Sequence, residues 1–426
     1  MERNDPRYQA YVEILKEELI PAMGCTEPIA LAYAAAKARE VLGVLPDSVQ
    51  LQVSGSIIKN VKSVIVPNTG HLKGMGAAVA AGIIAGSAEK ELEVISEVSE
   101  EKKSAIRDYL QTVPITIEHT EQGHVFDIVV TERCGQDYAR VRIADYHTNI
   151  CRIEKNGTVL YEVPLLDETV QEDARADRSL LNMQDIWDFA ETADLRDVAD
   201  LLERQIRYNN AIAEEGLLGD YGANIGRVLL TTYGNDVSNR AKAKAAAGSD
   251  ARMNGCELPV IINSGSGNQG ITCSVPLIEY AKELHSGKEK LYRALIISNL
   301  VAIHEKTGIG TLSAYCGAVS AGAGAGAGIV YLCGDGYQAA IHTVVNALAI
   351  VSGIVCDGAK ASCAAKIASS VDAALLGYNM YKCNQEFKGG DGIVMKDIET
   401  TIKGIGRLGK DGMRQTNEEI IRLMMS

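Results

Sequence analysis

The chain has 426 residues, too many for one ordinary hydrophobic core, which predicts two or three domains. Its formal net charge of -13 disfavours nucleic acid and anionic membrane surfaces as partners, because their phosphates would repel it. Hydrophobic residues make up 46% and charged residues 23%, as in a globular protein, so we expect a small molecule or another protein as the partner.

The first 20 residues, MERNDPRYQAYVEILKEELI, are charged and amphipathic. They lack the basic start, the continuous apolar segment and the cleavage site of a signal peptide. No apolar run approaches the roughly 18 residues that cross a bilayer. We therefore expect a cytoplasmic protein, whose ten cysteines stay reduced instead of forming structural disulfides.

The pattern of the N-terminal part predicts an α+β domain with an antiparallel sheet. The expected helices span 8–20, 27–42, 74–86 and about 88–110. Period-two alternation indicates a strand over 49–67, and consecutive strands follow over 113–163. The last two strands turn on Asn156-Gly157, a dipeptide typical of a tight hairpin.

Residues 166–178 are acidic and poor in apolar side chains, as expected of a linker. We place a domain boundary there, between an α+β domain over 1–170 and a mostly α-helical bundle over 179–426. The expected helices of the bundle span 183–215, 236–247, 274–285, 289–305, 309–331, 336–352 and 358–380. Glycine is costly inside a helix, so the run AGAGAGAG at 321–328 predicts a close approach of a neighbouring helix or ligand.

Cys25 lies in PAMGCTEPIA, at the joint between the first two expected helices. Thr26 suits the N-cap of the second helix and Pro28 suits its first turn, which places the thiol at a helix N-terminus. The helix dipole favours the thiolate and lowers the pKa of the thiol, whereas Glu27 opposes this effect. The pattern fits a reactive thiol, and it equally fits a buried cysteine in a helix connection.

The segment NSGSGNQGITCS carries a GxGxxG spacing at Gly265, Gly267 and Gly270. A dinucleotide-binding loop is disfavoured, because the following pattern is helical and no second strand ends on an acidic residue about 20 positions further on. A Gly-rich turn before a helix presents backbone N–H groups to an anion, so we expect it to hold a substrate carboxylate.

Cys316, Cys356 and Cys363 lie among glycines and other small residues, which would let a bulky inorganic group approach the backbone. The spacing of the last two matches no zinc finger, redox dithiol or ferredoxin run. Three cysteines without a fourth would leave one iron of a [4Fe-4S] cluster open, and an open position is typical of catalytic metal sites.

Five segments carry a family resemblance: PAMGCTEPIALAYAAAKA, VSGSIIKNVKSVIVPNTGHLKGMGAAVAAGIIAG, NSGSGNQGI, LSAYCGAVSAGAGAGAG and GIVCDGAKASCAAKIA. Together they resemble the L-cysteine desulfidase family, which is related to the bacterial iron-sulfur L-serine dehydratases. The likeness runs through almost the whole chain, and the Cys25 segment is specific to the desulfidases. The resemblance implies a lyase with an oxygen-sensitive [4Fe-4S] cluster that eliminates sulfide from L-cysteine and gives pyruvate and ammonia.

The resemblance also implies residue roles. Cys316, Cys356 and Cys363 would ligate the cluster. The implied substrate-binding residues are Thr26, Ser54, Ser56, Gly265, Gly267 and Asn268. The gap between Cys356 and Cys363 is shorter than in the dehydratases, and the chain ends RLMMS where they can carry a cysteine that reaches the cluster. Cys25 is therefore the expected thiol at the open iron. The α+β domain would correspond to the dehydratase β portion and the bundle to the α portion.

The implied reaction is a β-elimination on an amino acid. The leaving sulfur would bind the open iron, and the Cys25 thiolate would take the α-proton or act as a displaceable ligand of that iron. Two alternatives stay open: an iron-sulfur L-serine dehydratase, and a non-enzymatic thiol or redox sensor. The sequence is compatible with a homo-oligomer and does not determine the oligomeric state.

Overall fold

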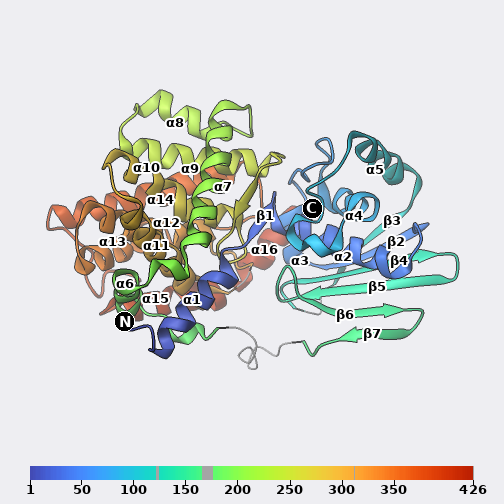
Figure 1. Cartoon of the computed structure of the whole chain (residues 1–426), viewed down its shortest axis with the longest axis horizontal. Coiled ribbons are helices and arrows are strands. Elements are labelled where there is room, and N and C mark those ends of the chain that lie inside the picture. Colours follow the sequence, from blue (N-terminus) through green and yellow to red (C-terminus); the bar gives the residue numbers. More distant parts are fainter. Residues whose placement is uncertain (121–123, 166–175, 311, 426) are drawn as a thin grey trace.

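The computed structural model describes residues 1–120, 124–165, 176–310 and 312–425. Two lobes lie side by side (Figure 1). We call the described residues of 26–165 the sheet lobe, and those of 1–20 and 176–412 the helical lobe. The predicted α+β fold class is confirmed, with a sheet in the N-terminal part and helices in the C-terminal part.

The sheet lobe carries helices on a six-stranded sheet. Its helices are α2 (Thr26–Leu42), α3 (Gly55–Val61), α4 (Gly74–Ala85), the 3-10 helix η1 (Ala88–Glu93) and α5 (Glu100–Thr112). Its strands are β2 (Ser48–Ser54), β3 (Ile115–Thr120), β4 (Asp127–Cys134), β5 (Asp137–Ala144), β6 (Ile150–Lys155) and β7 (Thr158–Glu162). The strand order is β3-β2-β4-β5-β6-β7. All pairs are antiparallel except β2–β3, so the sheet is mixed at that edge.

The β6–β7 hairpin turns on Asn156-Gly157 as predicted. Both residues have positive φ, 50° and 80°, as the tight two-residue turn of a hairpin requires. The strand expected over 49–67 is wrong in its second half, because β2 ends at Ser54 and the chain continues as α3. The apolar residues of that stretch, Ile57, Ile58 and Val61, are buried at helical spacing.

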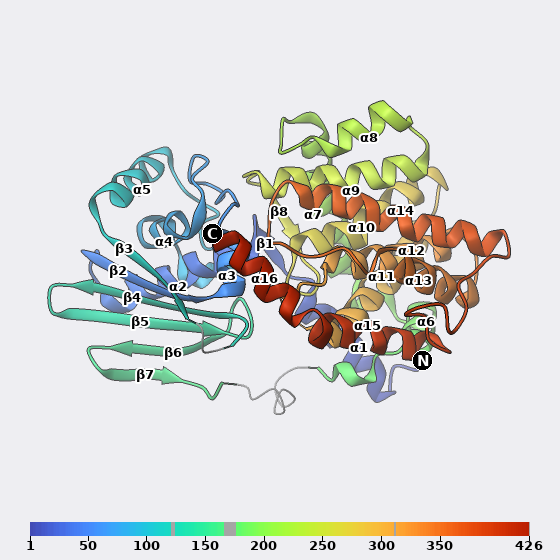
Figure 2. The same cartoon turned by 180° about the vertical axis from the view of Figure 1, so that it is seen from behind.

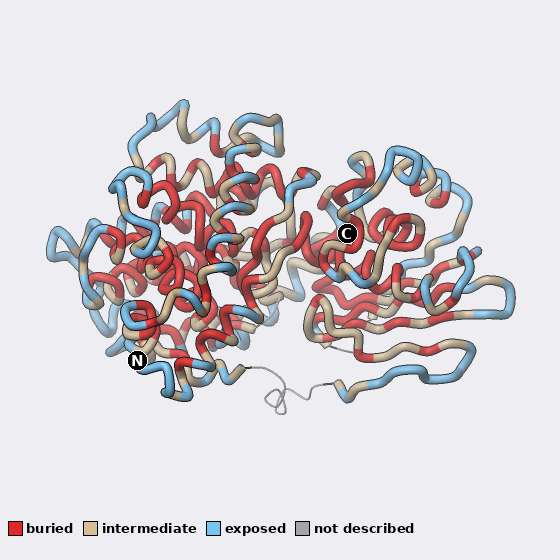
Figure 3. The backbone as a smooth tube through the Cα atoms, in the orientation of Figure 1, coloured by how far each residue is buried: buried red, intermediate tan, exposed pale blue. Residues whose placement is uncertain are grey.

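The helical lobe is a bundle around α12. Its helices are α1 (Pro6–Glu18), η2 (Arg178–Leu180), α6 (Met183–Thr192), η3 (Leu195–Asp197), α7 (Ala199–Leu218), α8 (Ile225–Tyr233), α9 (Val237–Met253), α10 (Gly267–Glu283), α11 (Lys288–Ile309), α12 (Gly317–Cys333), α13 (Tyr337–Val351), α14 (Ser362–Lys382), α15 (Ile398–Arg407) and the π-turn η4 (Leu408–Gly412). α12 packs against α10, α11, α13 and α14 and is almost entirely buried (Figure 3). A Cβ on Gly324 would lie 2.4 Å from the carbonyl oxygen of Ser298, so the alternate glycines permit the close helix approach that their run predicted.

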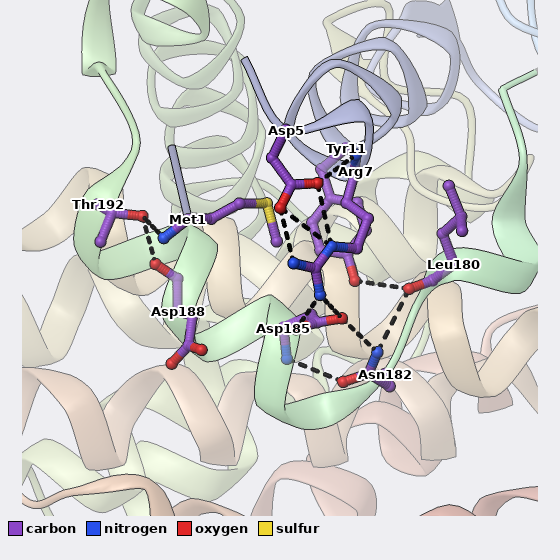
Figure 4. A network of polar contacts seen from close by, with 9 residues as sticks. All are labelled: Met1, Asp5, Arg7, Tyr11, Leu180, Asn182, Asp185, Asp188 and Thr192. Atoms are coloured by element: carbon purple, nitrogen blue, oxygen red, sulfur yellow. Dashed lines mark hydrogen bonds and ion pairs between the residues drawn. The ribbon is translucent and has the colours of Figure 1, made fainter. Parts of the chain in front are cut away.

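α1 precedes the sheet lobe in sequence but packs on the helical lobe (Figure 4). The guanidinium of Arg7 donates to Asp5 and, at 2.9 Å, to Asp185 of α6, and the Tyr11 hydroxyl donates to the carbonyl oxygen of Leu180 at 2.8 Å. The predicted linker spans 166–178, of which 166–175 lie outside the described residues, so the division into 1–170 and 179–426 stays a prediction.

Two elements connect the lobes. β1 (Pro21–Met23) pairs antiparallel with β8 (Pro259–Ile261) of the helical lobe and leads directly into α2. α16 (Arg414–Met425) runs from the helical lobe to α3 of the sheet lobe (Figure 2). Across the described residues, no helix has both the length and the apolar character needed to cross a membrane.

Candidate active site at the lobe junction

Cys25 lies where the chain passes from β1 to α2, and its side chain is 2% exposed. The N-cap of α2 is Cys25 itself, with extended backbone and no side-chain cap hydrogen bond. The expectation that Thr26 caps this helix is therefore wrong by one residue. The Thr26 hydroxyl instead contacts the Glu27 carboxylate at 3.2 Å and donates to the carbonyl oxygen of Gly265 at 3.0 Å. Thr26 thus joins the start of α2 to the glycine loop of the helical lobe.

Glu27 is the buried anion of this joint. Its carboxylate accepts hydrogen bonds from the Cys25 thiol at 3.0 Å and from Asn60 Nδ2 of α3 at 2.9 Å. His147 Nε2, on the loop between β5 and β6, lies 3.8 Å from Glu27 Oε1. Burial alone would raise the pKa of Glu27, but the nearby His147 ring and the hydrogen bond from Cys25 outweigh it and hold the pKa at about 2.

The proton of this pair rests on sulfur. Burial and the Glu27 carboxylate raise the pKa of Cys25 well above its usual value, and the positive charge of Arg252 opposes this only in part. The expected lowering of the Cys25 pKa by the helix N-terminus is therefore wrong for the protein without bound metal or ligand. Cys25 is a neutral thiol that donates to a carboxylate.

The glycine loop is a tight turn followed at once by α10. Asn263 and Ser266 form an isolated antiparallel bridge, and the two residues between them, Ser264 and Gly265, have φ of 48° and 75°. α10 begins at Gly267, seven residues before the predicted helix. Positive φ at both central residues marks a type I′ turn, so this spacing builds a turn and a helix start, and not a dinucleotide fingerprint.

Each glycine of the motif has a packing reason. A Cβ on Gly265 would lie 3.1 Å from the His147 ring, and one on Gly270 would lie 1.9 Å from the carbonyl oxygen of Ile261 in β8. A Cβ on Gly267 would lie 2.3 Å from Nε of Arg252, so the guanidinium rests directly on the first residue of α10. The loop is therefore shaped to receive His147 from the sheet lobe and Arg252 from α9.

Several polar atoms of the site have no hydrogen-bond partner in the described part of the chain. They are Asn60 Oδ1, His147 Nε2, Arg252 Nε, Asn268 Oδ1 and Gln269 Oε1. Buried polar groups are normally paired, so unpaired atoms concentrated at one place indicate a site for a polar ligand. Asn268, predicted to bind substrate, belongs to this group.

The two predicted serines lie at the start of α3. Ser54 is buried, and its hydroxyl donates to the carbonyl oxygen of Val125 at 2.7 Å, which is a contact within the sheet lobe. Ser56 is buried in the first turn of α3, three and four residues before Lys59 and Asn60 and hence on their face of the helix. A substrate role for either serine stays a prediction.

The three predicted ligand cysteines meet in the helical lobe. Tyr315 and Val355 form an antiparallel bridge, Cys316 N donates to the Ile354 carbonyl oxygen at 3.2 Å, and Cys356 N donates to the Ala314 carbonyl oxygen at 2.6 Å. Cys316 is the N-cap of α12, while Cys363 lies in the first turn of α14. Burial and the negative charges of Cys356 and Cys363 raise the pKa of Cys316 to about 12.

Lysines surround these thiols. Lys59 of α3 donates to the carbonyl oxygen of Cys356 at 3.4 Å, and Lys366 donates to that of Val355 at 2.8 Å. Burial lowers the pKa of Lys306 to about 8, although the charges of Cys356 and Cys316 oppose it. Three soft thiol ligands with cations around them form a donor set that fits an anionic iron-sulfur group. Within the described residues, no three His, Cys, Asp or Glu side chains are placed to hold a single metal ion. A cubane cluster needs a different arrangement, because each cysteine binds a different iron.

Two routes connect Cys25 with the three cysteines. In the first, Asn60 donates to Glu27 while the adjacent Lys59 contacts Cys356. In the second, Thr26 binds Gly265, and Gln269 at the other end of the loop packs on Gly317, where a Cβ would lie 2.6 Å from Gln269 Cδ. The Cys25 joint and the segments that carry the three cysteines are therefore linked by contacts at the lobe junction.

Sequence reasoning missed half of this site. In the sequence, Glu27 stands out only as a charge that opposes the thiolate, and His147 is one of seven scattered histidines. Lys59 and Asn60 were hidden inside an expected strand, and Arg252 ends an Ala-rich helix. The available signal was a polar Lys-Asn pair inside the apolar run SIIKNV, which is unusual for a buried segment.

Comparisons with known proteins agree with the family resemblance. A family model described as serine dehydratase alpha chain matches residues 89–422. A UPF0597 protein of Desulfitobacterium hafniense (strain Y51) is 61% identical over 426 residues, covering 100% of this chain and 99% of that protein. UPF0597 proteins of Lachnoclostridium phytofermentans and Treponema denticola are 52% identical over 419 residues and 46% identical over 430 residues. They cover 98% and 100% of this chain, and 100% of each relative.

The family match includes the loop, Arg252 and the three cysteines, whereas Cys25 precedes it and is covered by the full-length relatives. It supports a lyase of the serine dehydratase type. The names of the family and of these relatives specify neither a cysteine substrate nor a cofactor. Because the family model and relatives above 45% identity agree along the chain, this protein belongs to the serine dehydratase alpha chain family.

Proposed function

We propose that the protein is an L-cysteine desulfidase, which converts L-cysteine and water to pyruvate, ammonia and hydrogen sulfide. The observation that carries this proposal is the Cys25 thiol bound to the Glu27 carboxylate in the same site as Cys316, Cys356 and Cys363. A proton-handling pair beside three soft ligands suits a β-elimination of sulfide, which needs a base for the α-proton and stabilisation of the leaving sulfur.

Cys316, Cys356 and Cys363 would hold a [4Fe-4S] cluster. Once bound, such a cluster supplies a Lewis acid with one open iron, which withdraws electron density from the leaving sulfur. The lysines beside the thiols favour their anionic form, as cluster ligation requires. Cys363 is held at the start of α14, where its thiol lies 3.6 Å from the carbonyl oxygen of Gly358.

Cys25 is the proposed base. Its own proton moves to Glu27 along the 3.0 Å hydrogen bond, and the resulting thiolate takes the α-proton of the substrate. The electron pair of the Cα–H bond forms the Cα=Cβ bond, and sulfide leaves with the pair of the C–S bond. The aminoacrylate product then hydrolyses to pyruvate and ammonia. With pKa values this far apart, the proton returns to sulfur in the resting site, so positive charge must enter beside Cys25 before the thiolate forms.

Glu27, Asn60 and His147 are positioning residues in this scheme. Asn60 and His147 hold the carboxylate toward Cys25, and the edge of Phe126 contacts the His147 ring with centroids 4.7 Å apart. Thr26 fixes the turn that carries the loop. Cys25 therefore works within a frame contributed by both lobes.

The decisive experiment uses protein purified and reconstituted with iron and sulfide under anaerobic conditions. We expect equimolar sulfide, pyruvate and ammonia from L-cysteine, and a strong loss of turnover in Cys25→Ala. Cys383→Ala, which changes an exposed cysteine, is the matched control and should keep wild-type turnover. Turnover of L-serine alone would instead assign an L-serine dehydratase. Brown, cluster-loaded protein that consumes neither amino acid would assign the thiol or redox sensor.

A further inference from the structure

Arg252 is a buried cation at the site without a counter-charge. It lies in the last turn of α9, and its residue is 2% exposed. Across the described residues its side chain makes no hydrogen bond or ion pair, and its Nε is completely enclosed. Burying an unpaired charge is costly, and proteins retain such a group where an anionic ligand supplies its partner.

The surroundings of Arg252 indicate where that anion binds. Its guanidinium packs directly on Gly267, the first residue of α10. A Cβ at this position would lie only 2.3 Å from Nε of Arg252, so only glycine leaves room for it. The first-turn N–H groups of a helix have no intrahelical acceptor and favour negative charge. The hydroxyl of Thr26, the residue after Cys25, donates to the carbonyl oxygen of Gly265 at 3.0 Å, two residues before Gly267. An anion between Arg252 and the start of α10 would therefore lie next to Cys25.

We propose that Arg252 and the first turn of α10 bind the α-carboxylate of the amino-acid substrate and make the protein selective for a free carboxylate. This inference rests on the proposed function and extends it with a specificity-determining residue. A guanidinium matches a carboxylate with two parallel N–H donors, which fixes the orientation of the ligand as well as its charge. Fixing the carboxylate there places Cα, one bond away, beside the Cys25 sulfur.

The test compares L-cysteine with L-cysteinamide, which lacks the carboxylate charge. In the reconstituted enzyme we expect Arg252→Gln to raise KM for L-cysteine roughly 10²- to 10³-fold, as expected for losing one member of a buried charge pair. The KM for L-cysteinamide should change little, so the variant should largely lose the preference for the free acid. Arg252→Lys keeps the positive charge but lacks the two parallel N–H donors. Its KM for L-cysteine should therefore lie between those of wild type and Arg252→Gln. Arg240→Gln, which removes the α9 arginine paired with Glu283, is the matched control and should keep the wild-type preference.

A binding measurement separates this inference from the proposed function. L-alanine cannot eliminate a β-substituent, so its binding to the cluster-free protein by isothermal titration reports the carboxylate contact alone. If loaded wild-type protein consumes neither L-cysteine nor L-serine, the proposed function fails, yet weaker L-alanine binding by Arg252→Gln still supports the inference. L-alanine binding that is absent, or equal in wild type and variant, overturns it, as does an Arg252→Gln enzyme with the wild-type preference. If circular dichroism shows that Arg252→Gln is unfolded, the same two measurements on Arg252→Lys, L-alanine binding and substrate preference, decide the question.

Discussion

The lobe junction holds two kinds of thiol, which differ in the charges around them. Cys25 donates to the Glu27 carboxylate, which raises its pKa. Around Cys316 and Cys363 burial and neighbouring thiolates raise the pKa values, and the positive charge of Lys366 opposes this. Burial acts in the same direction on both kinds, so the partners make the difference.

The two environments suit two different tasks of sulfur chemistry. A thiol next to a carboxylate keeps its proton and has an acceptor ready for it, which suits proton transfer. For thiols that face lysines, the positive charge offsets part of the rise in pKa that burial and neighbouring thiolates cause, and metal ligation requires their anionic form. α3 connects the two environments, since Asn60 binds Glu27 and Lys59 contacts Cys356.

The largest effect is expected at the lysine-lined group. Cys356→Ser removes one of the three soft ligands, so we expect reconstituted protein to lose most of its iron, from about four irons per chain, together with sulfide release. Iron and acid-labile sulfide analysis and the absorbance near ~400 nm measure this loss. Cys383→Ser, at the exposed end of α14, should retain both. Wild-type iron content in Cys356→Ser would show that this cysteine is not a ligand.

Glu27→Gln removes the negative charge beside Cys25 but keeps the shape of the side chain. Without the charge that raises it, the pKa of Cys25 falls, so at pH 8 more of this thiol is ionised. Methylthiolation of Cys25 in cluster-free protein, followed by mass spectrometry of its peptide, should become faster. Turnover should fall roughly 10²-fold because the proton of Cys25 loses its acceptor, while the iron content stays unchanged.

Glu40→Gln is the control for that substitution, since Glu40 is exposed on the same helix α2 and pairs with Lys37. It should change neither the thiol reactivity nor the turnover. If Glu27→Gln reacts at the wild-type rate and keeps wild-type kcat, Glu27 does not handle the Cys25 proton, and the difference between the two kinds of thiol has no catalytic meaning.

The sequence indicated the cysteines of the site because cysteine is rare and each stands beside glycine or at a helix start. It also indicated the hairpin at Asn156-Gly157 and the close packing of AGAGAGAG, since these are local demands on the backbone. The glycine loop was located correctly, although its helix begins earlier than expected. Local patterns of this kind can be read without knowing the fold.

The partners of those cysteines could not be predicted in the same way. Glu27, Asn60, His147, Lys59 and Arg252 are common residue types on four separate segments, and only the packing of the two lobes brings them together. The misread strand over 49–67 concealed α3, the element that links both groups of thiols. The pKa of Cys25 likewise depends on burial and on Glu27, which outweigh the helix start that the sequence displayed.

Glu132, which lies outside the candidate site, tests whether hydrogen-bond and charge partners, more than burial, determine the protonation of a buried carboxyl group. It is fully buried on β4, and neither carboxylate oxygen has a hydrogen-bond partner in the described chain. Burial raises its pKa to about 9, and the charge of Arg39 offsets this only in part. The contrast with Glu27, buried in the same lobe with a pKa of about 2, follows from the donors that only Glu27 has.

Between pH 4.5, the ordinary pKa of a Glu side chain, and about pH 9, Glu132 is protonated in the native state and ionised in the unfolded state. This difference sets the sign of its effect on stability. The native state binds more protons in this window, so the free energy of unfolding falls as pH rises, by at most about 1.4 kcal/mol per unit. Glu132→Gln removes this dependence. Cluster-free Glu132→Gln should therefore match wild type near pH 5 and melt several degrees higher at pH 8, whereas Glu162→Gln on the exposed strand β7 should follow wild type at both. Equal melting temperatures of Glu132→Gln and wild type at pH 8 would mean that Glu132 is already ionised in the fold, and that burial without donors does not keep a carboxyl neutral here.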